Sequence, residues 1–336
     1  MKVLYAIQGT GNGHLGRAME IAPHLKERAE VDFLISGKTA ELKFPFELKY
    51  NYHGIFFFFG KRGGVDYLSS FRHLKPLRLW RDIRDFPVKD YDLVITDFEP
   101  ISAWAAKRAG VPVIALSHQA SFYSDKVPLP RFRNRFFEYG MKHWVAPAND
   151  YVGLHYRPYD DQVLPPIIRK SLTTGRPTDE GHVTVYLPAY SDETLIHHFS
   201  KLDDVSFHIF TKKSDQERKV NNVLLRPVSK TDYTHSLLSC KGLITGGGFQ
   251  STSEALYLKK KLLVLPMWDQ YEQKCNAAAL RKMGVRISKK ISARFSEELV
   301  QWLAGDEPID YYEYVPDTSR VADKVMEVGE RLVGST

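Results

Sequence analysis

Ser251 and Glu254 lie three and six residues after a run of three glycines, Gly246, Gly247 and Gly248. An apolar run leads into the glycines and apolar residues at helical spacing follow them, which predicts a parallel strand that turns into a helix. Such turns bind anions, because glycine lets the backbone approach a ligand and the unpaired amides at the helix start point toward it. Ser251 and Glu254 lie on one helical face. We therefore expect a phosphate site beside a carboxylate that can accept hydrogen bonds from a ribose or sugar diol.

A second glycine-rich turn lies within Gln8–Arg17, where His14 follows Gly11 and Gly13 and precedes a helical pattern. No acidic residue follows the next predicted strand in the manner of dinucleotide-binding folds. This departure argues against a dehydrogenase. A histidine at a helix start could cap or pack the helix, or it could accept a proton from a substrate.

Two further polar residues follow predicted strands. Asp97 comes after an apolar strand over residues 92–96, and His118 comes after a strand over residues 111–116. Since the carboxyl ends of parallel strands meet at one edge of a sheet, Asp97 and His118 are expected to face the same crevice as His14. Asp97 could instead cap the helix that begins near Pro100.

Length and pattern predict the architecture. A chain of 336 residues suits two domains. Short apolar runs alternate with helical patterns in both halves, which predicts two doubly wound α/β domains that face each other across a cleft. Prolines and glycines interrupt the periodicity between them. We expect an N-terminal domain over 1–163, a C-terminal domain over 164–318, and a final helix within 319–336.

Composition restricts the class of protein. The hydrophobic content is 43% and the net charge is +7. No apolar run approaches the roughly 20 residues that span a bilayer, and an apolar strand begins almost at Met1, which leaves no room for a signal peptide. Cys240 and Cys275 provide neither a disulfide framework nor metal-ligand spacing. We expect a cytoplasmic protein.

Nearly all of the net positive charge lies in residues 1–150. It gathers in two clusters with aromatic residues, one that begins at Phe56 and continues through Lys61 and Arg62 to Arg84, and one at Arg131–Phe137. These clusters could be a buried strand and solvated helix faces. They could also form a surface that contacts an anionic acceptor or binds peripherally to the inner face of a membrane.

The string from Thr245 to Ala277 resembles the donor-binding signature of the GT-B glycosyltransferases. The most similar families are the UDP-glycosyltransferases and the bacterial enzyme that adds N-acetylglucosamine to the lipid-linked peptidoglycan precursor. The matching positions are the glycines with Gln250, Ser251 and Glu254, then Glu272-Gln273, then Asn276-Ala277.

The resemblance implies roles for the domains and for these residues. Residues 1–163 would form the acceptor-side domain, residues 164–318 would bind the nucleotide-sugar, and the helix within 319–336 would pack back on the first domain. Glu254 would hold the donor ribose, while Glu272 and Gln273 would hold the donor sugar. The glycine loop with His14 is similar to the N-terminal loop of the same families, in which the histidine deprotonates the acceptor and an aspartate, here Asp97, orients it.

The chain departs from the family pattern at one position and leaves a second ambiguous. Gly246 stands where those families have His or Arg next to the diphosphate, so a direct cationic contact is missing there. Asp269-Gln270 also looks like a sugar-binding pair, but counting back from Asn276 selects Glu272-Gln273.

The expected function is therefore that of an inverting, metal-independent glycosyltransferase. We expect a nucleotide-sugar donor, above all a UDP-sugar. The acceptor would be a hydroxyl group of a saccharide, a lipid-linked molecule or a small molecule. No cofactor and no bound metal ion are expected. One alternative is a nucleotide-sugar hydrolase or epimerase on the same fold. Another, suggested by the basic clusters, is a nucleic-acid-binding protein, although the sequence contains no recognisable nucleic-acid motif.

Overall fold

Seven parallel strands form the first sheet, in the spatial order β3-β2-β1-β4-β5-β6-β7. The computed structural model describes residues 1–10, 12–37, 43–54, 75–267, 269–305, 308–313 and 315–335. The central strands are almost entirely apolar because helices cover both faces of the sheet. The strands are β1 (Lys2–Gln8), β2 (Glu30–Ser36), β3 (Tyr50–Tyr52), β4 (Leu93–Asp97), β5 (Val113–Ser117), β6 (Asp150–Leu154) and β7 (Val163–Leu164).

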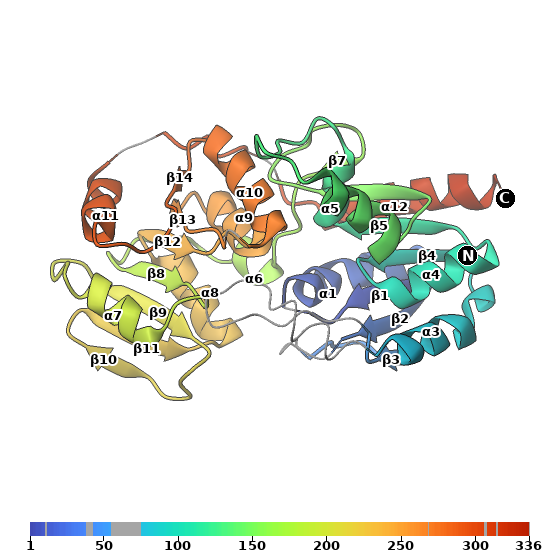
Figure 1. The fold of residues 1–336 in the computed structure, drawn as a ribbon, viewed down its shortest axis with the longest axis horizontal. Coiled ribbons are helices and arrows are strands. Elements are labelled where there is room, and N and C mark those ends of the chain that lie inside the picture. Colours follow the sequence, from blue (N-terminus) through green and yellow to red (C-terminus); the bar gives the residue numbers. More distant parts are fainter. Residues whose placement is uncertain are drawn as a thin grey trace.

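Helices cover the two faces of this sheet (Figure 1). One face packs on α1 and α12, and the other packs on α3 and α4. Short helical segments follow β5 and lead toward the second domain. The helices of this domain are α1 (Asn12–Lys26), α3 (Pro76–Asp85), α4 (Pro100–Ala109), α5 (Arg135–Gly140) and α12 (Thr318–Val333), with 3-10 turns at Val88–Asp90 and Gln119–Tyr123 and a π-helical turn at Met141–Val145.

A second seven-stranded sheet has the order β10-β11-β9-β8-β12-β13-β14. It contains β8 (Val183–Tyr186), β9 (Phe207–Thr211), β10 (Arg218–Val220), β11 (Val223–Pro227), β12 (Gly242–Thr245), β13 (Lys261–Val264) and β14 (Arg286–Ile287). Its helices are α6 (Lys170–Thr173), α7 (Asp192–Phe199), α8 (Lys230–Ser239), α9 (Phe249–Tyr257), α10 (Tyr271–Lys282) and α11 (Phe295–Ala304). The expected architecture of two parallel-sheet α/β domains is confirmed.

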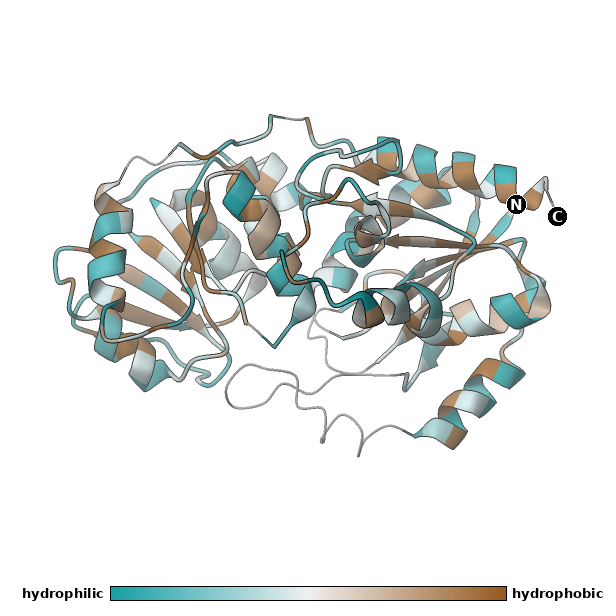
Figure 2. Ribbon diagram, turned by 45° about the horizontal axis from the view of Figure 1, so that its top comes forward, coloured by the Kyte–Doolittle hydropathy of each residue, from teal (hydrophilic) through white to brown (hydrophobic). Residues whose placement is uncertain are grey.

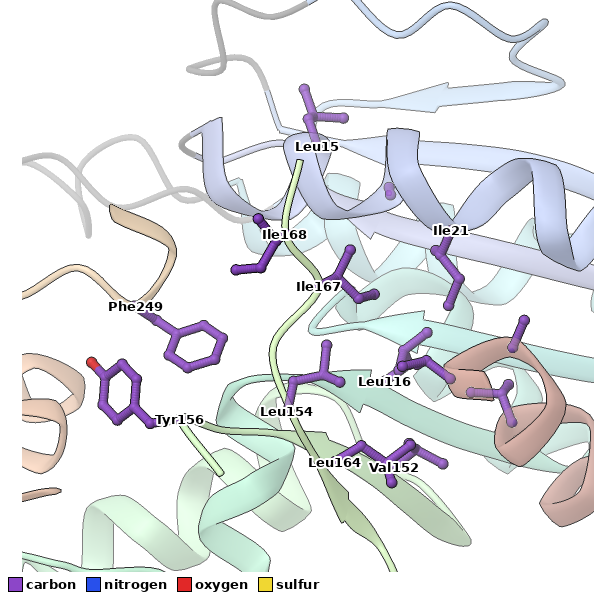
Figure 3. Packing of buried hydrophobic residues seen from close by; sticks show 14 of the residues in the cluster. Leu15, Ile21, Leu116, Val152, Leu154, Tyr156, Leu164, Ile167, Ile168 and Phe249 are labelled. Carbon is purple, nitrogen blue, oxygen red and sulfur yellow. The ribbon is translucent and has the colours of Figure 1, made fainter. Parts of the chain in front are cut away.

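One hydrophobic core runs from the first domain into the second. The connecting segment, residues 165–169, runs from β7 to α6. Figure 3 shows the core cluster, in which Ile167 and Ile168 of this segment lie between Leu15 of α1 and Phe249 of α9. The segment carries apolar side chains because it is covered on both sides. The two domains are therefore joined by packed side chains and not by an open linker.

Helix α12 crosses back from the second domain to the first, where it contacts α1, β5 and β6. Hydrophobic and hydrophilic bands alternate along it (Figure 2), and the Asp317 side chain caps it by accepting a hydrogen bond from the amide of Arg320 at 2.9 Å. Gly329 allows the close approach, because a Cβ at this position would lie 2.5 Å from a methyl group of Leu93. A larger residue there would force the Leu93 side chain to shift.

Two local features differ from the sequence expectations. β10 and β11 pair antiparallel around a two-residue turn with Asn221 at a φ of 52°, so the second sheet contains a hairpin that the sequence analysis did not predict. The Arg131–Phe137 cluster is helical only from Arg135, and this helix changes into a π-helical turn at Met141. Within the described ranges, no helix combines the length and apolarity needed to cross a membrane.

Candidate active site

The carboxyl ends of β1, β4 and β5 face the amino ends of α9 and α10 of the second domain. His118, just after β5, stacks on Phe249, the first residue of α9, with ring centroids 3.8 Å apart and planes 4° apart. Its Nε2 lies 2.6 Å from Oδ1 of Asn276 on α10. The predicted residues of both halves therefore meet in one region of the molecule.

His14 and Asp97 lie in contact, as their positions after neighbouring strands suggested. Nδ1 of His14 is 2.7 Å from Oδ1 of Asp97, and the side chains are 14% and 0% exposed. The backbone brings them together because Ile7, near the end of β1, pairs in register with Asp97. Asp97 does not cap α4, because the Glu99 side chain accepts the amide hydrogens of Ile101 and Ser102. The capping alternative for Asp97 is wrong.

Arg17 completes this cluster, and the sequence analysis had not selected it. Its Nε donates to Oδ2 of Asp97 at 3.0 Å, and its Nη2 contacts both carboxylate oxygens. Burial would raise the pKa of Asp97, but Arg17 and then His14 hold that pKa below its usual value. Asp97 is thus a buried anion that two basic side chains share. The sequence signal for Arg17 was its position three residues after His14, on the same face of α1.

The C-terminal glycine turn has the expected strand-to-helix geometry. Gly247 has a φ of +83°, which side chains rarely adopt, and Gly248 begins α9 without a side-chain cap. Gly246 follows β12 directly, and a Cβ at either Gly246 or Gly247 would lie under 4 Å from Oε1 of Gln273. The uncapped helix start leaves backbone amides that suit an anion.

Glu254 is almost fully buried in α9, and its carboxylate already has partners. Arg169 donates to both oxygens, each at 2.6 Å, and Gln250 donates to Oε1 at 2.8 Å. Ser251 lies next to Tyr233. Arg169 comes from the connecting segment, and the sequence analysis missed it because no local pattern links it to a residue 85 positions away. Arg169 brings a positive charge next to α9, whereas Gly246 supplies none.

Helix α10 presents Glu272 and Gln273 toward the glycine turn and the first domain. Gln119 donates to Oε2 of Glu272 at 2.9 Å, and Gln273 accepts from the amide of Met267 at 2.9 Å. Asp269 is exposed, whereas Gln273 is buried. This arrangement favours Glu272 and Gln273 over Asp269 as residues of the crevice, in line with the register counted from Asn276.

His118 is buried between the domains. Its Nδ1 is 2.8 Å from the carbonyl oxygen of Leu154, and burial lowers its pKa although Glu272 and its hydrogen-bond partners act in the opposite direction. Its two ring nitrogens are thus engaged in contacts within the protein.

Gly13 lies in the first turn of α1, with open space where a Cβ would stand, and Gly11 lies outside the described residues. In the part of the chain that the structure describes, no three His, Cys, Asp or Glu side chains gather as a metal site.

Comparisons with known proteins give a consistent result. A family model described as glycosyl transferase family 1 matches residues 1–304. The structure is similar to CalG4, the calicheamicin glycosyltransferase (TM-score 0.61, 13% identity, 98% of each chain covered). It is also similar to Acinetobacter baumannii MurG (TM-score 0.59, 14% identity, 97% of this chain and 99% of that one). A third is Phytolacca americana UGT2 complexed with UDP-2-fluoro-glucose and pterostilbene (TM-score 0.57, 15% identity, 98% and 93% covered). A search of curated proteins finds no match.

Proposed function

Since the chain belongs to glycosyl transferase family 1 and has the GT-B fold, we propose that it moves a sugar from a UDP-sugar to an acceptor hydroxyl, with inversion at the anomeric carbon and without a metal ion. The observation that carries the proposal is the contact of 2.7 Å between His14 and Asp97 at the edge that faces α9 and α10. This contact supports the assignment of His14 as the base, opposite the proposed phosphate site at the start of α9.

In the proposed reaction, Nε2 of His14 takes the proton of the acceptor hydroxyl while the oxygen attacks the anomeric carbon. The bond from that carbon to the diphosphate oxygen breaks, and the diphosphate leaves with the electron pair. Asp97 fixes the imidazole by accepting from Nδ1, which leaves Nε2 as the basic nitrogen. Amides at the start of α9 would stabilise the departing negative charge.

Glu254 would hold the donor ribose, with Arg169 beside it as a source of positive charge near the diphosphate. Because Arg169 already occupies both carboxylate oxygens, ribose hydroxyls must either use the remaining lone pairs or displace part of this contact. Ribose binding at Glu254 is thus coupled to the position of Arg169.

Glu272, Gln273 and Gln119 would contact the donor sugar. The amide oxygen of Gln119 is buried and has no hydrogen-bond partner among the described residues. A sugar hydroxyl could satisfy this oxygen and also bond to Glu272, which Gln119 contacts across the two domains.

A thermal-shift screen of nucleoside diphosphates and sugar nucleotides tests the donor assignment. A ligand at 100 times its dissociation constant stabilises by about 2.7 kcal/mol, and UDP should give a larger shift than other nucleoside diphosphates. Incubation of the best donor without acceptor provides the control. Rapid, stoichiometric release of free sugar would favour the hydrolase alternative, and equal shifts for all nucleotides would contradict the UDP assignment.

We also propose that the segment Arg131–Trp144, termed here the aromatic-basic surface, meets an anionic, lipid-linked acceptor. Phe132 is 88% exposed and Phe136 is 72% exposed, and arginines alternate with them. Lys61 and Arg62, which the sequence analysis grouped with this surface, lie outside the described residues.

Co-sedimentation with vesicles tests this surface. Binding to anionic vesicles should weaken as salt rises and should fall in Phe132→Ser/Phe136→Ser. The control is Val315→Ser, which changes an apolar side chain that is 87% exposed elsewhere. No binding at low salt, or equal losses in both variants, would contradict the proposal.

A further inference from the structure

We propose that Arg17 is a positioning residue of the proton-transfer site, which holds the Asp97 carboxylate so that its Oδ1 orients His14. This inference rests on the proposed function, in which His14 is the base. Arg17 projects from the same face of α1 as His14 and reaches Asp97 at the end of β4.

The geometry at Asp97 leaves the carboxylate little freedom. Nε and Nη2 of Arg17 both contact Oδ2, at 3.0 and 2.8 Å, and Nη2 also contacts Oδ1 at 2.5 Å. A planar guanidinium that bonds both oxygens fixes the plane of the carboxylate, which a single-point cation cannot do. The direction of Oδ1 toward His14 therefore depends on the shape of the Arg17 side chain.

Burial makes the charge of Arg17 necessary as well. Asp97 is 0% exposed and Arg17 is 4% exposed, and a buried carboxylate without a cation would be expected to take up a proton. Burial alone would lower the pKa of Arg17, but Asp97 raises it above its ordinary value, with smaller contributions from Tyr5 and Glu272. Both members of the pair thus stay charged.

Oδ1 of Asp97, Nδ1 of His14 and Nη2 of Arg17 contact one another, and these contacts define two states of the imidazole. His14 Nδ1 is 2.7 Å from Oδ1, and Arg17 Nη2 is 3.0 Å from the same Nδ1. If Nδ1 carries its proton, it donates to Oδ1 and Nε2 is the base. If Nδ1 has no proton, it accepts from Nη2, and Nε2 is protonated and cannot act as a base. Arg17, by holding Oδ1 in place, favours the first state.

The experiment compares Arg17→Gln, Arg17→Lys and the double variant Arg17→Gln/Asp97→Asn with wild type. The control is Arg28→Gln, because Arg28 forms an ion pair with Asp323 at 2.6 Å in the same domain but away from the site. We expect Arg17→Gln to lower kcat about 10–100-fold, as a misplaced catalytic group does, while the donor KM stays within about twofold. Arg17→Lys should recover only part of kcat, because lysine restores the positive charge but not the planar group that contacts both carboxylate oxygens.

The double variant shows whether Arg17 affects kcat through Asp97. It also removes both buried charges, so it provides a second test if Arg17→Gln does not fold. If Arg17 acts through Asp97, the double variant should have the kcat of Asp97→Asn alone. The proposal would be overturned if the fold-losses in kcat of the two single variants multiply in the double variant. It would also be overturned if Arg17→Gln loses thermal stability but keeps its kcat.

A readout that does not need activity separates this inference from the proposed function. ¹⁵N NMR of histidine-labelled protein reports which nitrogen of His14 carries the proton. Arg17→Gln should shift the His14 signals away from the Nδ1-protonated form, while Arg28→Gln should not. Unchanged signals would overturn the role of Arg17 even if transfer is confirmed. Changed signals would support it even if His14→Ala shows that the base lies elsewhere.

Discussion

The two glycine-rich turns have the same backbone plan but differ in the side chains that follow. After the N-terminal turn, His14 and Arg17 of α1 converge on a buried aspartate. After the C-terminal turn, Glu254 of α9 is an anion whose cation comes from the connecting segment. The glycines thus account for the turn, whereas the residues that follow differ, and we propose that the first set transfers a proton and the second binds the donor.

The largest effect that would test this division is expected at the N-terminal turn. His14→Ala should lower kcat by roughly 10²–10⁴ and leave the donor Kd nearly unchanged, because a general base acts on the acceptor. Asp97→Asn should act in the same direction. Measurement of kcat and donor Kd for both variants decides the matter. A His14→Ala enzyme with most of its kcat would mean that the base lies elsewhere, and His118 would be the next residue to test.

The converse effect is expected at the C-terminal turn. Glu254→Gln removes charge-assisted hydrogen bonds worth about 1.5–3 kcal/mol, so affinity for the nucleoside diphosphate should fall about tenfold to a hundredfold. Because Arg169 would lose its anionic partner, Arg169→Gln/Glu254→Gln serves as the control for stability. An unchanged Kd in a folded Glu254→Gln variant would remove Glu254 from the donor site.

A matched pair of glycine substitutions sharpens the comparison. A Cβ at Gly13 or at Gly248 meets no atom within 4 Å, and neither residue has a positive φ, so both alanine variants should fold. Gly248→Ala places a methyl group at the uncapped start of α9 and should weaken nucleotide binding about tenfold, or about 1.4 kcal/mol. Gly13→Ala should leave nucleotide affinity unchanged. Equal effects on the Kd measured by titration would show that the two turns are not specialised.

The smallest effect concerns the sugar itself. Glu272→Ala and Gln273→Ala should each weaken the sugar nucleotide about two- to tenfold, as expected for one lost hydrogen bond of about 0.5–1.5 kcal/mol, and leave free nucleoside diphosphate binding intact. Asp269→Ala should change neither Kd. Greater discrimination in Asp269→Ala would overturn the register counted from Asn276.

Much of the fold could be predicted because its signals are local. Buried parallel strands are continuous apolar runs, and helix starts carry capping residues such as Ser191 before α7. The β10–β11 hairpin escaped prediction because β10 is polar and short. The roles of Arg17 and Arg169 could not be predicted, since each pairs with a residue 80 or more positions away, and only the tertiary structure brings them together.

The return of α12 to the first domain has a consequence for the order of folding. α12 follows every strand of both sheets in the chain, and it covers a face that α1, β5 and β6 have formed long before. During synthesis this face stays uncovered until the second domain has been made. An incomplete chain therefore exposes it to other molecules. The first domain is therefore the first to be synthesised and the last to be completed.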